Sequence, residues 1–264
     1  MSGSAVADTA PVRSKALVAL AVALVIALAW VGAAGRVPAY ILPSPGDIGL
    51  ATLKFFGSAR QLAHLGATLT HIGISIFIAF VLGTLLALAA HYADWSAAAI
   101  HQRLSPFLNA FSGIGWTLLA VIWFGVSSAT VVFSISVVLL PFAIVNLREG
   151  LLALDRELLE MGASFGRRRL RNFVAIVVPA PLPVAAATLR IMFGVAWKVA
   201  LTAELFGGSR GLGYMINIAR QDYDTATIFT VILFIVFAVY LADRGLFAPL
   251  ERYTSRHFGR AGTR

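Results

Sequence analysis

Two basic side chains inside an apolar stretch are the residues best placed to bind a charged molecule. Arg190 and Lys198 both fall within the run Pro183–Phe206, eight residues apart. That spacing puts them about 80° apart on one broad face of an α-helix, and Gly194 between them leaves room for a solute. Charges inside a membrane span usually face a bundle interior or an aqueous cavity, so the pair predicts contact with an anion. The alternatives are that Arg190 snorkels to the interface and that Lys198 pairs with a carboxylate.

Glu204 lies near the far end of the same run, directly before a glycine-rich segment. Its carboxylate could pair with a cation, or it could hold the loop that follows. That loop contains Gly207, Gly208, Gly211 and Gly213, a composition that suits a segment bending back toward the membrane or closing a gate. It does not fit a phosphate-binding loop, because no GxGxxG opens a helix after a strand.

Aromatic side chains are further candidates for a solute pathway. The rings of His71, Trp116, Trp123 and Trp197 could pack against an organic tail. For each of them, ordinary helix packing or a position at the membrane interface is the alternative.

Catalysis and metal binding have little support in the sequence. An intramembrane hydrolase would need a nucleophile and a base; Ser75 and His71 lie one helical turn apart, but no acid partner follows from the spacing. The five histidines are too scattered for a metal site, and the chain has no cysteine. We therefore expect neither catalytic residues nor a metal.

The composition defines the kind of element that must position these residues. Of 264 residues, 59% are apolar and only 12% are charged, and the mean hydropathy is +0.85. Ordinary soluble domains carry about 25% charged residues. The low charge argues against a soluble enzyme or a nucleic-acid-binding domain and predicts an all-α membrane protein.

The apolar runs predict about six transmembrane helices, because about 20 mostly apolar residues are needed to cross a bilayer. They are Ala16–Ala34, Thr68–Ala90, Phe107–Phe124, Thr130–Leu147, Pro183–Phe206 and Ala226–Phe247. The first could instead be a cleaved signal peptide, but it is longer than the roughly 7–15 apolar residues usual there.

The distribution of basic residues predicts the orientation. The formal net charge is +9, and cytoplasmic loops collect Lys and Arg. With both termini in the cytoplasm, the basic residues left on the outside are Arg36, Lys54, Arg60, Arg210 and Arg220. The predicted divisions are a cytoplasmic tail (1–15), a first helix with an external segment (16–66), a core of spans (67–250) and a basic cytoplasmic tail (251–264).

The external segment contains one feature with two interpretations. Pro43 and Pro45 stop any helix, and Ser44 could cap a new one. The apolar residues from Ile48 to Phe56 keep helical spacing. A short helix along the membrane surface and a plain loop are both compatible with this pattern.

The cytoplasmic loop 148–181 is amphipathic rather than apolar. Leu151, Leu154 and Leu158 share one helical face, and Gly162 and Gly166 interrupt the pattern. This predicts two short helices bent at a glycine beneath the membrane. Such an elbow is suited to docking in a partner's groove.

A motif in this loop resembles that of the permease subunits of ATP-binding-cassette (ABC) importers. Glu160-Met161-Gly162 is followed after three residues by Gly166, then after nine more by Ile176, and Val178-Pro179 closes the motif. The family's usual Ala-Ala is replaced by Met161-Gly162, and its Leu before the proline by Val178.

Four further segments resemble the nitrate, taurine and aliphatic-sulfonate uptake branch of this family. They are Leu42–Pro45, Trp123–Gly125, Ala203-Glu204 and Gly211–Tyr214. Two features depart from the branch: Ser112–Ile122 lacks its prolines, and His71 stands where an arginine is usual.

The resemblance implies the fold, partners and roles of a type I importer permease in the bacterial inner membrane. Two copies would line the path as a homodimer, two cytoplasmic ATPase subunits would use ATP and Mg, and an external solute-binding protein would deliver solute. Coupling to the ATPases would fall to Glu160, Met161, Gly162, Ala163 and Gly166. Glu204 would have a structural role. Membrane lipid is the remaining partner, with no nucleic acid and no cofactor bound by this chain.

The resemblance is compatible with several solutes. The resemblance includes sulfonates, taurine, nitrate and bicarbonate, and an uncharged vitamin precursor is the alternative. A secondary transporter driven by an ion gradient is the competing class, but it would not need the cytoplasmic elbow, and internal repeats would be expected. The chain lacks GxxxxGK[ST], so ATP would be hydrolysed by another chain.

Overall fold

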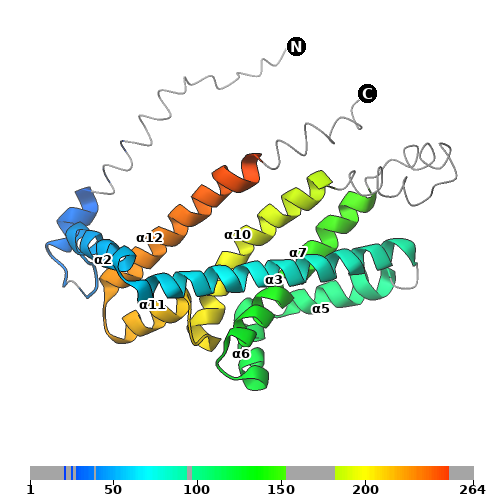
Figure 1. The fold of residues 1–264 in the computed structure, drawn as a ribbon, viewed down its shortest axis with the longest axis horizontal. Helices are drawn as coiled ribbons and strands as arrows, with labels where there is room; N and C mark the ends of the chain where they lie inside the picture. Colours follow the sequence, from blue (N-terminus) through cyan, green and yellow to red (C-terminus); the bar gives the residue numbers. More distant parts are fainter. Residues whose placement is uncertain are drawn as a thin grey trace, which may run out of the picture.

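The computed structural model describes residues 21, 25, 28–38, 40–93, 97–152 and 182–249, and the coupling residues 160–166 lie outside this part. Within the described part the regular structure is all helical (Figure 1). The long helices are α3 (Ala59–Tyr92), α7 (Ser128–Leu152), α10 (Leu182–Gly207) and α12 (Thr225–Ala242). The shorter ones are α2 (Pro45–Gly57), α5 (Ser105–Ala110), α6 (Gly113–Phe124) and α11 (Leu212–Gln221), with π-helical turns at Ala99–Leu104 and Asp243–Phe247.

Four of the predicted spans are long apolar helices in the structure. These are α3, α7, α10 and α12, the last continued by its π-helical turn to Phe247. Figure 1 shows α7, α10 and α12 inclined in the same direction, with α3 running across them. The first predicted span, Ala16–Ala34, lies mostly outside the described residues; 28–34 are helical.

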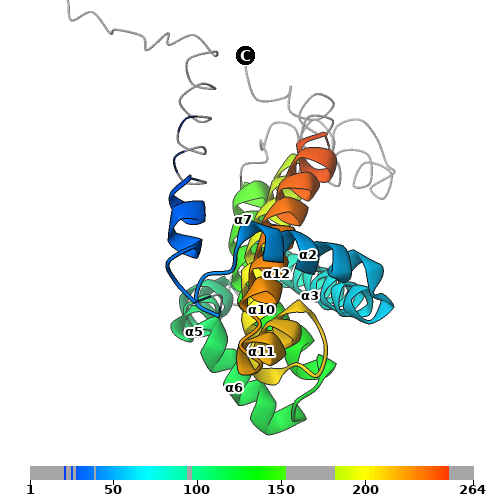
Figure 2. The same cartoon turned by 90° about the vertical axis from the view of Figure 1, so that its left-hand side faces the viewer.

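The predicted span Phe107–Phe124 is wrong as one straight helix. It is two helices, α5 and α6, at 87° to one another, and Figure 2 shows α6 continuing below α5. Phe111 is extended, and the Ser112 side chain caps α6 by accepting a hydrogen bond from the Gly115 N–H. Apolar composition alone does not reveal this break, because the residues at the corner, Phe111 to Gly113, are themselves apolar or small.

The corner between α5 and α6 is filled by Trp116. Its indole N–H donates to the Leu108 carbonyl (3.1 Å), and its ring packs against Phe107 and Phe111. This side chain is buried. Trp116 therefore packs the bend, which is the alternative to its predicted place on a solute pathway.

The helix interpretation of the external segment is confirmed by α2. Ser44 and Asp47 form a reciprocal capping box, and Pro45 occupies the first turn. Phe55 is almost fully buried and packs against Phe234 of α12, with ring centroids 5.6 Å apart. Helix α2 is thus fixed to the end of the helical bundle.

The central packing runs between α3, α7 and α10. On α3, Ala79, Gly83 and Ala87 form a small-residue stripe at four-residue spacing, and both alanines are fully buried. A Cβ added at Gly83 would collide with Ala143 of α7. Small residues allow helices to approach closely in a membrane, and this contact holds α3 against α7.

Helix α3 begins nine residues before the predicted start at Thr68. Residues 59–67 include Arg60, Gln61 and His64, so hydropathy alone did not extend the apolar run to them. The segment is helical because Ala, Arg, Gln and Leu are good helix formers. The extension places Arg60, His64, Thr68 and His71 on one continuous helix. Their spacings of four, four and three put them on one face.

Candidate functional site

A buried carboxylate joins three segments at one end of the bundle. Glu204 of α10 is fully buried. Its Oε1 lies 2.8 Å from His71 Nδ1, and its Oε2 accepts hydrogen bonds from the Thr68 hydroxyl and the Gly213 N–H, both at 2.9 Å. The carboxylate therefore connects α3 to the glycine-rich loop and the start of α11.

The loop is also tied directly to α3. The Leu212 N–H donates to the Thr68 hydroxyl oxygen at 2.7 Å, and the Gly211 N–H donates to His64 Nδ1 at 3.2 Å. These bonds satisfy backbone donors at the start of α11 that have no partner inside that helix. The loop is thus held by hydrogen bonds from two neighbouring helices.

Glycine is required where this loop meets Glu204. Gly211 has φ +118° and ψ 173°, a combination that is essentially restricted to glycine. A Cβ there would collide with the Glu204 carboxylate, and a Cβ on Gly213 would lie 2.7 Å from Glu204 Cβ. The glycines give the backbone access to the carboxylate.

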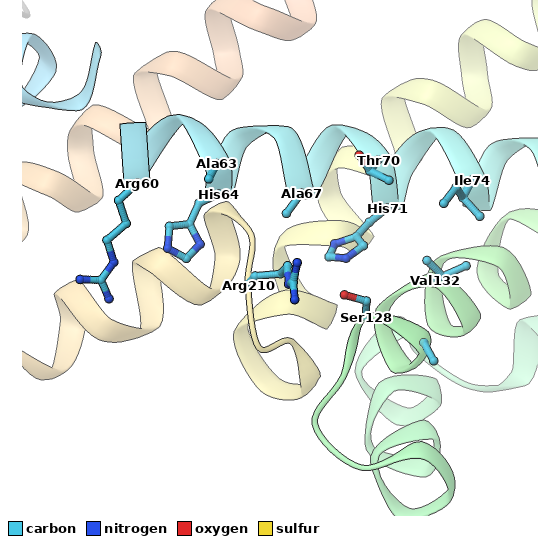
Figure 3. A pocket seen from close by; sticks show the side chains of 11 residues that line it. Arg60, Ala63, His64, Ala67, Thr70, His71, Ile74, Ser128, Val132 and Arg210 are labelled. Carbon is cyan, nitrogen blue, oxygen red and sulfur yellow. The ribbon is translucent and has the colours of Figure 1, made fainter. Parts of the chain in front are cut away.

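A cavity of about 650 Å³ opens beside this hydrogen-bonded group (Figure 3). It lies between the first half of α3, the start of α7 and Arg210 of the loop. Its polar and charged lining residues are Arg60, His64, Thr70, His71, Ser128 and Arg210, and its apolar ones are Ala63, Ala67, Ile74, Ala129 and Val132. The lining contains four potentially cationic side chains and no carboxylate.

Arg190, one of the two predicted anion contacts, is paired with a carboxylate. Its Nε donates to Asp243 Oδ1 at 2.6 Å and its Nη2 to Oδ2 at 3.0 Å, a two-point contact between α10 and the end of α12. Both side chains are about 40% exposed. Arg190 is about 21 Å along α10 from Glu204, so the structure does not bring the two together.

Lys198 differs from Arg190 in both position and partners. It is exposed on α10 on the same side as Ile191, and a Cβ at Gly194 would meet nothing within 4 Å. Within the described part of the chain its ammonium group has no ion pair. This face of α10 is therefore open and carries one uncompensated positive charge.

The remaining aromatic candidates have different surroundings. Trp197 is buried and its ring meets Phe193 edge-on, whereas Trp123 is 57% exposed and packs against Phe124 and Phe133. Neither lines the cavity beside Glu204. Of the predicted pathway residues, the structure brings only His71 and Glu204 together.

Sequence reasoning missed Arg60, His64, Thr68, Ser128 and Arg210 as members of one site. The available signal was the spacing of Arg60, His64, Thr68 and His71, which is that of one helical face. Arg60 and His64 precede the predicted start of the span at Thr68, so the apolar run alone does not place them on the same helix as His71. The approach of Ser128 and Arg210 depends on tertiary structure alone.

The family of the chain follows from comparison with known proteins. Residues 79–244 match the family model described as binding-protein-dependent transport system inner membrane component. The putative aliphatic sulfonates transport permease protein SsuC of Bacillus subtilis (strain 168) is 28% identical, over 82% of this chain and 78% of its own. The taurine transport system permease protein TauC of Escherichia coli (strain K12) is 26% identical, over 76% and 73%. The formylaminopyrimidine transport permease protein ThiX of Halalkalibacterium halodurans is 32% identical, over 73% and 76%.

Solved structures with the same fold include chains of ABC transporters. A chain of the MetNI methionine ABC transporter in an inward-facing conformation aligns with a TM-score of 0.60 at 18% identity, covering 77% of this chain and 96% of that one. An amino acid ABC transporter gives a TM-score of 0.58 at 15% identity, covering 78% and 97%. The chain therefore belongs to the inner membrane components of binding-protein-dependent transport systems, and it is a membrane-embedded permease subunit of an ABC importer rather than an enzyme.

Proposed function

We propose that two copies of this chain form the path of an importer for a small organic anion of the sulfonate class. The importer would include two cytoplasmic ATPase subunits, which use ATP and Mg, and an external solute-binding protein. Both termini of the permease would lie in the cytoplasm of a bacterial cell. The family supports the ATPase and binding-protein partners in general, and the names of two relatives support the solute class.

The observation that carries the anion assignment is the open face of α10. Lys198 lies within an apolar helix long enough to cross the membrane, and placing a charge there is costly unless it faces a cavity or a partner. Its ammonium group has no carboxylate partner in the described part. A pathway anion would supply the missing negative charge.

An uncharged solute is the second candidate, since one relative is named for formylaminopyrimidine transport. The two candidates are separated by transport into liposomes containing the permease, its neighbouring ATPase and its binding protein. We expect ATP-dependent uptake of a labelled alkanesulfonate, with formylaminopyrimidine failing to compete. Uptake of formylaminopyrimidine with no effect of alkanesulfonates would overturn the anion assignment.

Replacing Lys198 with methionine is expected to raise the KM for an alkanesulfonate about tenfold or more. Hydrogen bonds to charged groups contribute about 1.5–3 kcal/mol, and each 1.4 kcal/mol is about a factor of ten. Uptake is measured in the same liposomes. The matched control is Lys54→Met on the exposed surface of α2, which should leave KM unchanged; an unchanged KM in Lys198→Met would remove that residue from the path.

Replacing Gly166 with proline is expected to uncouple the ATPase. We propose that residues 160–166 dock on the ATPase subunits and transmit their closure to the spans as a rigid-body movement. Proline removes a backbone donor and fixes φ, so ATPase stimulation by the loaded binding protein should be lost. Gly166→Ala is the matched control and should retain stimulation. The coupling role would be excluded if Gly166→Pro copurified with the ATPase and showed normal stimulated hydrolysis.

A further inference from the structure

We infer that the cavity beside Glu204 is an oxyanion-binding site that receives the headgroup of a small alkanesulfonate or a similar monoanion. The inference rests on the proposed function for the nature of the solute, but it assigns a site away from Lys198. The residues that would donate hydrogen bonds to the anion are Arg210, Arg60, His64 and Ser128, and His71 forms part of the wall.

Two of the basic residues that line the cavity are arginines. Arg60 and Arg210 are both exposed, and neither forms an ion pair within the described part of the chain. The lining holds no Asp or Glu. Figure 3 shows the Arg210 side chain between the two histidines, with the Ser128 hydroxyl turned toward it. Guanidinium groups suit oxyanions because their N–H donors match pairs of oxygens in a fork.

The hydrogen bond at His64 leaves its second nitrogen for a ligand. His64 Nδ1 accepts the Gly211 N–H, so the ring proton of His64 must be on Nε2, which makes that atom a donor. The ring also stacks on Tyr214, with centroids 5.7 Å apart, which limits its rotation.

His71 is positioned in the complementary way. Its Nδ1 faces Glu204 Oε1 at 2.8 Å, and a carboxylate only accepts hydrogen bonds, so Nδ1 carries a proton. His71 is only 4% exposed, and it lines the cavity. His71 is thus held by Glu204 as part of the cavity wall.

The rest of the cavity fits a short organic tail. The Ser128 hydroxyl has no hydrogen-bond partner among the described residues, and Ala67, Ile74 and Val132 give the wall an apolar surface. A volume of about 650 Å³ is within the range of about 300–1,000 Å³ usual for small-molecule sites. Because cationic donors lie next to an apolar wall, the cavity favours an anionic headgroup joined to a small alkyl chain and disfavours an inorganic dianion.

The test is binding of propane-1-sulfonate to the purified permease–ATPase complex in a neutral maltoside detergent, measured by calorimetry. We expect saturable binding to wild type and none of 1-propanol, which has the tail without the anion. Arg210→Gln should raise the Kd about tenfold or more. Arg220→Gln is the matched control, because Arg220 is exposed on α11, its side chain donates to Asn217 and it does not line the cavity.

Three results would overturn the inference. The first is an equal Kd for wild type and Arg210→Gln, and the second is equal binding of the alcohol. The third is loss of sulfonate binding when phosphatidylglycerol is added to the detergent, which would assign the cavity to a lipid phosphate instead of a solute. Normal alkanesulfonate uptake by an Arg210→Gln variant with an unchanged KM would reject this site and leave the proposed function standing.

Discussion

Replacing Glu204 with alanine is expected to remove most of the folded permease from the membrane. The carboxylate accepts from the Thr68 hydroxyl, from the Gly213 N–H and from His71 Nδ1. Each buried donor left without an acceptor costs about 1–3 kcal/mol, so the three together cost about 3 kcal/mol at the least. A native protein has only about 5–15 kcal/mol of total stability.

The measurement for Glu204 is the yield and thermal midpoint of the purified protein, followed by gel filtration. Glu204→Gln is the informative partner variant. Its amide oxygen can still accept from Thr68 and Gly213, and its NH₂ can donate to His71 Nδ1 if the ring proton moves to Nε2. We therefore expect Gln to fold and Ala to fail. Equal yields and midpoints for wild type and Glu204→Ala would show that this carboxylate does not hold the loop.

Replacing Gly211 with alanine is expected to be nearly as damaging, for a different reason. The backbone of Gly211, at φ +118°, lies in a region that costs a non-glycine residue about 1–3 kcal/mol. The new methyl group would also collide with the Glu204 carboxylate. The loop or the carboxylate must then move, and the hydrogen bonds at Thr68 and Gly213 are lost with that movement.

The control for Gly211 is an alanine at a glycine with free space around it. Gly66 is exposed on α3, and a Cβ there would meet nothing within 4 Å. Gly66→Ala should be neutral or slightly stabilising, because alanine is the better helix former by about 1 kcal/mol. If both variants gave the same thermal midpoint as wild type, the close contact between Gly211 and Glu204 would not exist in the folded protein.

The spans were predictable where hydropathy and helical structure coincide. Helices α7 and α10 begin and end within a few residues of the predicted runs, because a continuous apolar helix is the usual way to cross a bilayer with its backbone groups paired. The 87° bend before α6 and the early start of α3 were not predictable in this way. One depends on Trp116 filling a corner, and the other on polar residues that are good helix formers.

The sequence shows that the charged residues within the spans are unusual, but it does not show which of them has a functional role. The sequence singled out both Arg190 and Lys198, since both are cations within an apolar run. The structure pairs Arg190 with Asp243, 53 residues further along the chain, and leaves Lys198 without such a partner in the described part. No local pattern distinguishes the two, because the distinction depends on what a neighbouring helix presents.

The sequence by itself determined that this is a helical membrane protein of an importer family, because composition, apolar run length and the loop motif are local properties of the chain. It also marked Glu204 and the glycines after it as a unit. Only the tertiary structure decided that His71 and Thr68 bind that carboxylate and that Arg60 and Arg210 share a cavity. These contacts join residues up to 147 positions apart, as between His64 and Gly211, and they exist because α3 packs against α7 and α10.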